Sequence, residues 1–497
     1  MHARLMKETR ELLPIFIGTL LLIVVPYLIW QGNAGELAYF VLAGGSAMLG
    51  VCAFGSEFQH RTLALLLSQP VARSMLWRDK MLVLGAGISA SLAVSAICML
   101  VYVPRLNPGG PIVLAMIALC ALCGTPYWIL ILRQSIGAMV CAVTIPAVLV
   151  GANELMKQWL FDHLAVEKIP SFVLLLLQIS PYVLLLLYCA VTFRRGYAQF
   201  ESLEDYDSTA GELSLPASLE TALAQPLASV SSRFHGPFAS LLKKEFRLQQ
   251  VSFLLAGVFF LIAAAGFCLI PIYLPAAEGT VGGDCALYIL ILPLVAGAIA
   301  VAEEKGWDLA EWHLTLPPSA RQQWSAKMLA TLTTSLALGL LLPAGILLAG
   351  GAVFEQHGSR PSFPLFYALA ALVLGQLLVT SVAVYAASFS KSTLRAILAA
   401  LGILVASLGG AVLAPRWGER SPLLLGLAAV LFRGHFVLPV LLLSPLLLLC
   451  LTQWFAWSNF RRFGAPARRL VIQFVVIFVA VELISLAVSY AALLPSH

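Results

Sequence analysis

The chain has 497 residues, of which 60% are hydrophobic and only 11% are charged, and its mean hydropathy is +0.93. Water-soluble domains carry about 25% charged residues, so this chain has too few charges to cover a water-facing surface of its size. The composition excludes a soluble globular protein and predicts an all-α polytopic membrane protein.

Apolar segments follow one another along the whole sequence, each long enough to cross a hydrocarbon layer of about 30 Å as a helix. The candidate spans lie at residues 12–30, 37–55, 81–103, 111–132, 136–152, 171–193, 252–274, 285–302, 328–350, 364–388, 396–414, 435–457 and 471–493. The sequence therefore predicts 12–13 transmembrane helices.

The positive charges are distributed unevenly between the spans. With the N-terminus placed in the cytoplasm, 23 of the 30 Lys and Arg residues fall on inner segments and seven on outer loops. Because cytoplasmic loops are enriched in Lys and Arg, this orientation is favoured, and the expected location is the cell inner (plasma) membrane. The net charge of +6 is then a consequence of topology, and it gives no indication of nucleic-acid binding.

A long polar segment divides the chain into two halves. Residues 196–240 contain six carboxylates among Ser, Pro and Ala, and such a segment cannot bury enough apolar surface to fold alone. We expect it to be a flexible cytoplasmic linker between a first half at 1–195 and a second half at 241–462, each with six spans. Residues 463–497 are predicted to add one extra C-terminal transmembrane helix.

The two halves share an internal repeat. When the sequence is shifted by 247 residues, nine of the 33 positions in 50–82 are identical, against about three expected by chance, and a fixed offset is typical of duplication. The first members of the nine pairs are Gly50, Ala53, Glu57, Leu67, Pro70, Trp77, Lys80, Met81 and Leu82, and the second are Gly297, Ala300, Glu304, Leu314, Pro317, Trp324, Lys327, Met328 and Leu329.

Two further matches occur at slightly different offsets. Lys7-Glu8-Thr9-Arg10 precedes the first span as Lys244-Glu245-Phe246-Arg247 precedes the seventh, and Phe193-Arg194-Arg195 closes the sixth span as Phe460-Arg461-Arg462 closes the twelfth. Each repeat crosses the membrane an even number of times, so the two six-helix repeats are predicted to be parallel.

The strongest match fills the loop between the second and third spans of each half. Both copies begin with a carboxylate, continue through an apolar stretch to a Ser/Thr-x-Pro motif, and close with Trp-x-x-Lys. This pattern predicts a short amphipathic helix on the inner face that ends at proline, which lacks an N–H. The closing residues are expected at the inner membrane surface, where aromatic and basic side chains gather: Trp77, Trp324, Arg73, Arg321, Lys80 and Lys327. A connector needed only for topology would explain one such loop, but its near-duplication favours a functional role.

The loop resembles that of type-2 ABC transporter permeases, which carry a Glu, then Thr-Leu-x-Leu-Leu-Leu-Ser-x-Pro-Val-Ser-Arg, then a Lys. The first copy matches at Glu57, Thr62, Leu63, Leu65, Leu66, Leu67, Ser68, Pro70, Val71, Arg73 and Lys80, and the second keeps Glu304, Leu314, Thr315, Pro317, Arg321 and Lys327. Two departures are His60-Arg61, where the family has a glycine before the threonine, and Pro318, which replaces the valine.

This resemblance implies that both loops are coupling helices that dock into separate ABC ATPase subunits. The implied coupling residues are Glu57, Arg61, Thr62, Ser68, Pro70, Arg73, Lys80, Glu304, Thr315, Pro317, Arg321 and Lys327. It also implies that the outer segments 153–170 and 415–434 dip back into the membrane, which agrees with their mixture of charges, aromatics and short apolar runs.

The chain lacks the sequence elements for ATP hydrolysis. No Gly-x-x-x-x-Gly-Lys-[Ser/Thr] motif occurs, and the dipeptide Gly-Lys is absent, so no phosphate-binding loop is predicted. We therefore expect a transport subunit that is not an enzyme and binds no cofactor. ATP and Mg²⁺ would be bound by the partner chains, of which two are expected for one fused permease. The apolar spans favour export of a hydrophobic or amphipathic cargo.

Polar residues inside the expected spans are few. Glu482 lies midway along the thirteenth span, and Asn153 and Glu154 lie at the outer end of the fifth; they form a possible intramembrane polar site, because such groups are costly in lipid. Helix–helix hydrogen bonding explains them equally well. The histidines and cysteines give no pattern for a metal site, since Cys120 and Cys123 lie mid-span without further ligands.

Two other functions remain as alternatives. An ion-coupled secondary transporter without an ATPase partner would require charges or broken helices near mid-membrane, and the first twelve spans contain almost none. An intramembrane enzyme would require a recognisable catalytic pair, and no such pair is identified.

Overall fold

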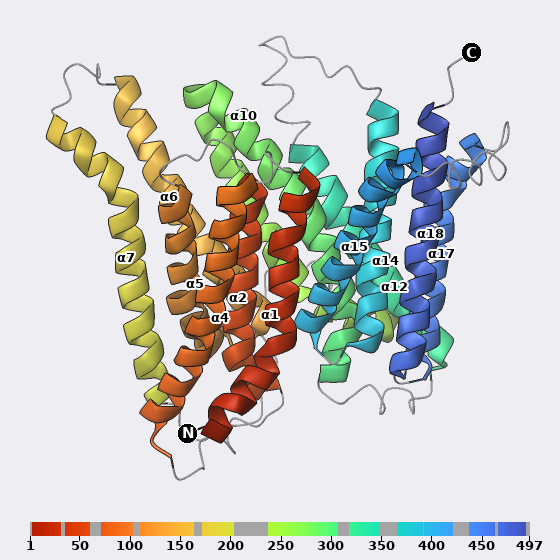
Figure 1. Ribbon diagram of the computed structural model, residues 1–497, viewed down its shortest axis with the longest axis horizontal. Coiled ribbons are helices and arrows are strands. Elements are labelled where there is room, and N and C mark those ends of the chain that lie inside the picture. The colour runs from red at the N-terminus through yellow and green to blue at the C-terminus, as the bar shows by residue number, and fades with distance from the viewer. Residues whose placement is uncertain are drawn as a thin grey trace. The chain divides into compact units, whose positions relative to one another are not determined.

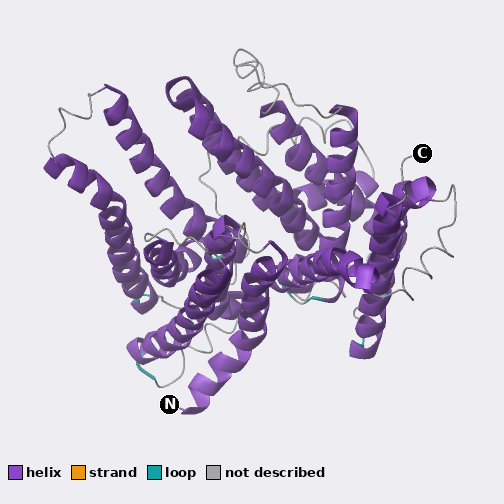
Figure 2. Cartoon of the chain, turned by 45° about the horizontal axis from the view of Figure 1, so that its top comes forward, coloured by secondary structure: helices purple, strands orange, loops and turns teal. Residues whose placement is uncertain are grey.

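The computed structural model consists of helices throughout the part that it describes (Figures 1 and 2). The described residues are 2–30, 35–59, 71–102, 110–163, 171–202, 237–306, 318–346, 365–390, 392–420, 437–462 and 466–493. No strand occurs in these ranges. An all-α polytopic membrane protein is thus confirmed at the level of helix content and apolar character.

The chain divides into two compact units, Met1–Ser218 and Leu219–His497. The first contains α1 (His2–Trp30), α2 (Gly35–Gln59), α4 (Arg73–Tyr102), α5 (Gly110–Leu132), α6 (Ser135–His163) and α7 (Ser171–Glu201). The second contains α9 (Pro237–Leu248), α10 (Gln250–Gly306), α12 (Ala320–Leu336), a π-helical turn η3 (Ala337–Leu341), α14 (Leu365–Phe389), α15 (Thr393–Arg420), α17 (Val437–Phe460) and α18 (Ala467–Leu493).

Six helical segments are long and apolar enough to cross a membrane, among the residues that the structure describes. They are Arg73–Val101, Gly110–Leu132, Ser135–Asn153, Leu176–Glu201, Ala320–Ile346 and Leu372–Phe389. A seventh results if α9 and the start of α10, which meet at a bend of 48°, form one broken span. Shorter apolar helices lie at Tyr39–Gly55, Thr393–Ser407 and Leu446–Phe460.

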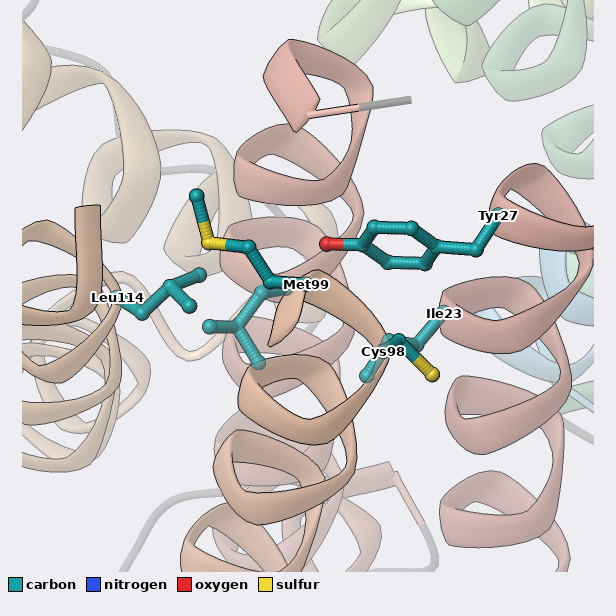
Figure 3. Close-up of a cluster of buried hydrophobic side chains, with 6 residues drawn as sticks. Ile23, Tyr27, Cys98, Met99 and Leu114 are labelled. Atoms are coloured by element: carbon teal, nitrogen blue, oxygen red, sulfur yellow. The ribbon is translucent and has the colours of Figure 1, made fainter. Parts of the chain in front are cut away.

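The first unit has an apolar core between α1, α2, α4 and α5. Its buried members are Ile23, Tyr27, Leu42, Cys98, Met99 and Leu114. Tyr27 extends its ring from α1 toward Met99 of α4 (Figure 3). Helices that are apolar on several sides, as these are, must be buried or lie in lipid, and this cluster holds four of them together at one level.

α10 is a continuous helix of 57 residues that folds back on itself. A straight helix of this length would extend about 85 Å, yet residues near its two ends are in contact. Gln249 Nε2 donates to the Ala296 carbonyl at 3.0 Å, and the rings of Phe259 and Tyr288 stack with centroids 3.8 Å apart. The second pair is closer in sequence than the first, as expected for two antiparallel segments, so the helix reverses direction between residues 264 and 285. The two spans predicted at 252–274 and 285–302 are therefore its two arms, joined by helix rather than by a loop.

Two glycines allow close helix packing at equivalent places in the units. A Cβ atom on Gly50 of α2 would lie 2.6 Å from the Thr125 side chain of α5. A Cβ atom on Gly297 of α10 would lie 2.7 Å from the Thr380 carbonyl and 2.6 Å from the Ala383 Cβ of α14. The 247-residue offset aligns these two glycines, and each permits the second predicted span of its half to approach the fourth.

α18 is attached to the second unit by buried amide groups. The Asn459 and Gln473 side chains donate to each other's oxygens at 3.1 Å, and Tyr385 donates to Gln473 Oε1 at 3.3 Å. Asn459 also donates to Ser388 Oγ at 3.1 Å, and the Lys305 ammonium donates to the Ser388 carbonyl. These bonds place the ends of α10, α14 and α17 beside the start of α18, at one end of the unit.

Some helices extend beyond the expected boundaries. α7 continues to Glu201, past the boundary predicted at 195, because Phe200 packs against Phe54 and Trp77. α6 continues to His163 and α15 to Arg420, which places the first part of each expected outer segment in helix. The remainder of those segments, 164–170 and 421–434, and linker residues 203–236 lie outside the described residues.

Candidate functional site

Much of each predicted coupling loop lies outside the described residues. This applies to 60–70 and 307–317, which contain Arg61, Thr62, Ser68, Pro70, Thr315 and Pro317. Glu57 lies in α2 and Glu154 in α6, but their side chains are not among those described. The candidate site is therefore built from the helix ends on either side of the loops.

Lys80, seven residues into α4, is buried in the first unit. Its side chain is 2% exposed, and its ammonium donates to Glu8 Oε2 at 3.0 Å and to the Ala53 carbonyl at 2.8 Å. It also lies 5.6 Å from the centre of the Phe54 ring. Removing an ammonium from water costs several kcal/mol unless it is paired and hydrogen-bonded, so these contacts fix α4 to the start of α1 and the end of α2.

Lys327, seven residues into α12, is buried in the same way in the second unit. Its side chain is 2% exposed, and its ammonium lies 2.9 Å from Glu245 Oε1, 2.8 Å from Glu304 Oε1 and 3.2 Å from the Ala300 carbonyl. Lys244 donates to the same Glu304 oxygen at 2.6 Å. Lys327, Glu245, Glu304 and Lys244, called here the Lys327 cluster, join α9, α10 and α12.

The two lysines make equivalent contacts. The 247-residue offset aligns Lys80 with Lys327 and Ala53 with Ala300, and each lysine binds the aligned carbonyl. The carboxylates Glu8 and Glu245 occupy the same place in the Lys-Glu-x-Arg motif before each half. The two matching motifs, one before each half and one closing each loop, are therefore in contact in both units.

Three buried carboxyl groups in and beside the Lys327 cluster differ in how readily they ionise. Burial alone would raise the pKa of Glu304, but Lys327 and Lys244 outweigh burial and lower that pKa to about 2. For Glu245, burial outweighs the same two lysines, and its pKa is raised. Burial, together with the charge of Glu304, raises the pKa of the neighbouring Glu303 to about 8. At neutral pH Glu304 is therefore ionised beside the two lysines, while Glu303 holds its proton.

An aromatic cluster packs beside each buried lysine. Trp77 is buried, and its ring contacts the rings of Phe54, Phe193, Tyr197 and Phe200. Trp324 contacts Trp457 and Phe460. The sequence placed Trp77, Lys80 and Lys327 at the level of the inner membrane surface, and in the structure all three side chains are buried within the protein.

The two predicted arginines behave differently. Arg73 Nη1 donates to the Glu201 carbonyl at 2.5 Å, which joins the start of α4 to the end of α7. Arg321 is exposed on the first turn of α12, and it makes no hydrogen bond or ion pair with the described part of the chain. Ser319 caps that helix, accepting from the Gln322 N–H while its own N–H donates to the Gln322 side chain.

The predicted intramembrane polar residues are divided between the two units. Asn153 belongs to the first unit, where its Oδ1 accepts from Ser180 Oγ at 2.8 Å. Glu482 belongs to the second unit, and its Oε1 is buried without a hydrogen bond from any described group. Among the described residues, no group of three His, Cys, Asp or Glu side chains has the geometry to hold a metal ion.

Two features of the site escaped sequence reasoning. One is the contact between the segments that precede the first and seventh spans and the buried lysines, for which the shared Lys-Glu-x-Arg motif was the available signal. The other is Cys189 of α7, whose Sγ lies 3.7 Å from Cys120 of the Cys-x-x-Cys pair. The three thiols are packed with Leu185 in an apolar cluster, where cysteine behaves as a small hydrophobic residue.

Comparison with known proteins identifies no relative. No family model matches the chain, and no curated protein or solved structure is similar to it. The fold and the site define an all-helical membrane protein with two buried lysine anchors.

Proposed function

We propose that this chain is the permease subunit of an ATP-driven exporter of the ABC type, with two parallel halves that arose by duplication. The observation that carries the proposal is the equivalent anchoring of Lys80 and Lys327. Each lysine follows one of the two matching loops and binds the preceding Lys-Glu-x-Arg segment and the end of the preceding helix.

The duplication is supported by contacts at three aligned pairs of positions. Besides the lysines, Gly50 and Gly297 each admit a neighbouring helix at close range. Trp77 and Trp324 each pack on the Phe of a Phe-Arg-Arg motif. Chance resemblance of apolar loops does not account for shared tertiary contacts, because these depend on residues far apart in the sequence.

The anchors suit transmission of force from a docked partner. In the first half the loop joins α2, which ends at Gln59, to α4, which begins at Arg73. Lys80 binds the Ala53 carbonyl of α2 and the Glu8 carboxylate of α1. A load on the loop therefore moves three helix ends together instead of bending the loop alone. In the second half Lys327 joins α9, α10 and α12 in the same manner.

The ATPase is a separate chain in this proposal. Since no phosphate-binding motif occurs in the sequence, ATP and Mg²⁺ are bound by partner ATPase subunits, two of which engage the two loops of one permease. The cargo is hydrophobic or amphipathic, and the chain lies in the inner (plasma) membrane with its N-terminus in the cytoplasm.

Co-purification tests the proposal. Affinity isolation of the full chain from its native membranes in mild detergent is expected to yield one permease with two ATPase chains, and charge reversal at Glu57 and Glu304 is expected to abolish the permease-dependent ATP turnover. Arg395→Glu, at an exposed position outside both loops, is the control. A 2:2 complex, or turnover that survives both reversals, contradicts the proposal.

The ion-coupled alternative makes a different prediction. Transport by such a carrier would stop when an ionophore dissipates the ion gradient and would continue when ATP is depleted. Transport by the proposed exporter would show the reverse dependence.

A further inference from the structure

The turn between α17 and α18 carries a concentration of arginines that the proposed function does not use. Arg461 and Arg462 follow the end of α17, and Arg468 and Arg469 lie in the first turn of α18. These four residues, called here the arginine turn, fall within nine positions, and the sequence from 447 to 481 contains no Asp or Glu. None of the four forms an ion pair with a described side chain.

Two of the arginines are held in place by the protein. The Arg461 guanidinium lies 5.6 Å from the centre of the Trp457 ring, and Arg469 Nη2 donates to Ser458 Oγ at 3.0 Å. Arg462 and Arg468 are exposed. Arg468 and Arg469 also lie where the helix dipole disfavours cations, so they do not serve the stability of α18 by itself.

Each helix carries an exposed apolar stripe that leads up to an arginine. On α17, Leu447, Trp454 and Arg461 are seven residues apart and share one face, with Trp454 68% exposed. On α18, Arg468 shares a face with Ile472, Val475 and Val479, which are also exposed. An apolar stripe that ends at a cation matches the chemistry of an anionic phospholipid, whose phosphate lies at the end of its acyl chains.

We propose that the arginine turn binds the headgroup of an anionic phospholipid, with the acyl chains along the exposed stripes of α17 and α18. The charge complementarity is direct: the four guanidinium groups form no ion pair with a described carboxylate, and they lie at the level where α17 ends. Arginine pairs with phosphate through two parallel hydrogen bonds, and basic groups between transmembrane helices hold anionic headgroups. This assigns a purpose to α18, which lies outside the repeat.

The first half provides a matched control for the general excess of positive charge at this membrane surface. It has the same Phe-Arg-Arg motif, with Arg194 and Arg195 exposed on α7. There α7 continues as helix to Glu201, and the described residues of the first unit contain no helix after α7 that would correspond to α18. If the arginines serve only to orient the chain in the membrane, the two Phe-Arg-Arg motifs should affect the retention of anionic lipid equally.

The test uses the full chain in vesicles made from phosphatidylcholine and phosphatidylglycerol, extracted and analysed by native mass spectrometry for the ratio of the two lipids retained. Each arginine that pairs with a bound anionic headgroup contributes about a fivefold preference for that lipid. The double variant Arg462→Gln with Arg468→Gln is therefore expected to lose most of the phosphatidylglycerol enrichment, by roughly tenfold or more. The double variant Arg194→Gln with Arg195→Gln is expected to leave it within about twofold of the unaltered chain.

Three results would overturn the proposal: unchanged enrichment in the Arg462/Arg468 variant, an equal loss in the Arg194/Arg195 variant, or displacement of phosphatidylglycerol by inorganic phosphate. If the double variant fails to fold, the single variant Arg468→Gln replaces it, because that exposed side chain forms no hydrogen bond or ion pair within the described chain. Loss of the enrichment leaves ATP-driven transport untouched, so this proposal and the proposed function fail independently.

Discussion

Replacement of Lys327 by methionine tests the buried anchor most severely. The substitution keeps an unbranched side chain, one atom shorter, and removes the cation between Glu245 and Glu304, whose oxygens lie 2.9 and 2.8 Å from it. Removing one partner of a buried ion pair costs about 3–5 kcal/mol, because the remaining charge is left uncompensated. With roughly 2–4 °C of melting temperature lost per kcal/mol in a unit of this size, a decrease of about 6–20 °C is expected.

The assay is thermal unfolding of the full chain in detergent, followed by the loss of the monodisperse peak in size-exclusion chromatography. Arg321→Gln is the matched control, since Arg321 lies six positions earlier on the same helix but is exposed, and its melting temperature is expected to change by less than about 2 °C. Adding Glu304→Gln to Lys327→Met should recover much of the loss, because Lys244 then balances Glu245. A Lys327→Met chain as stable as the Arg321→Gln control would refute the reasoning, as would a double variant less stable than Lys327→Met.

Three further predictions concern packing, protonation and the attachment of α18. Gly297→Ala is expected to destabilise the second unit by about 1–3 kcal/mol, because the new Cβ meets the α14 backbone. The control is Gly257→Ala, whose new Cβ would have no atom within 4 Å and which should be neutral or stabilising by up to about 1 kcal/mol. Equal shifts of the melting temperature in the two variants would contradict this difference. Glu303 keeps its proton up to about pH 8 when folded and loses it near pH 4.3 when unfolded. Stability relative to the Glu303→Gln variant should therefore fall as pH rises between these values, by up to about 1.4 kcal/mol per pH unit. Glu304 has an ordinary pKa in the unfolded chain and a pKa near 2 in the folded chain, so its own effect on stability is confined to lower pH. Parallel profiles of stability against pH for the Glu303→Gln variant and the unaltered chain would exclude the role of Glu303. In a double-mutant cycle, Asn459→Leu and Gln473→Leu should show a coupling of roughly 0.6–1.7 kcal/mol, whereas additive effects would mean that the reciprocal amide pair is not formed.

The helical class and the position of most helices followed from hydropathy, because lipid forces each crossing segment to satisfy its own backbone. The arms of α10 show the limit of that approach. Hydropathy located both apolar segments and the polar, glycine-containing stretch between them, but that composition indicated a loop, whereas the structure continues as helix through it. The extension of α7 to Glu201 was likewise missed, since it depends on Phe200 meeting Trp77 across the fold.

The candidate site was predicted only in part. Comparison of the two halves identified Lys80 and Lys327, as well as the glycines at 50 and 297, as equivalent positions. It did not predict that the lysines would be buried, because burial depends on carboxylates 72 and 82 positions away in the sequence. Nor did the sequence indicate that Glu303 would differ from Glu304, since the two neighbours differ only in which of them faces the lysines.

The arrangement on which the proposed function depends is tested most directly by the sidedness of the two loops. Variants with a single cysteine introduced at Thr62 or at Thr315 are treated with a membrane-impermeant maleimide in right-side-out and in inside-out vesicles. Labelling of the unaltered chain gives the background to be subtracted. Labelling of both positions in inside-out vesicles alone is the predicted result. Labelling of the two positions from opposite sides of the membrane would contradict parallel halves and a shared set of ATPase partners.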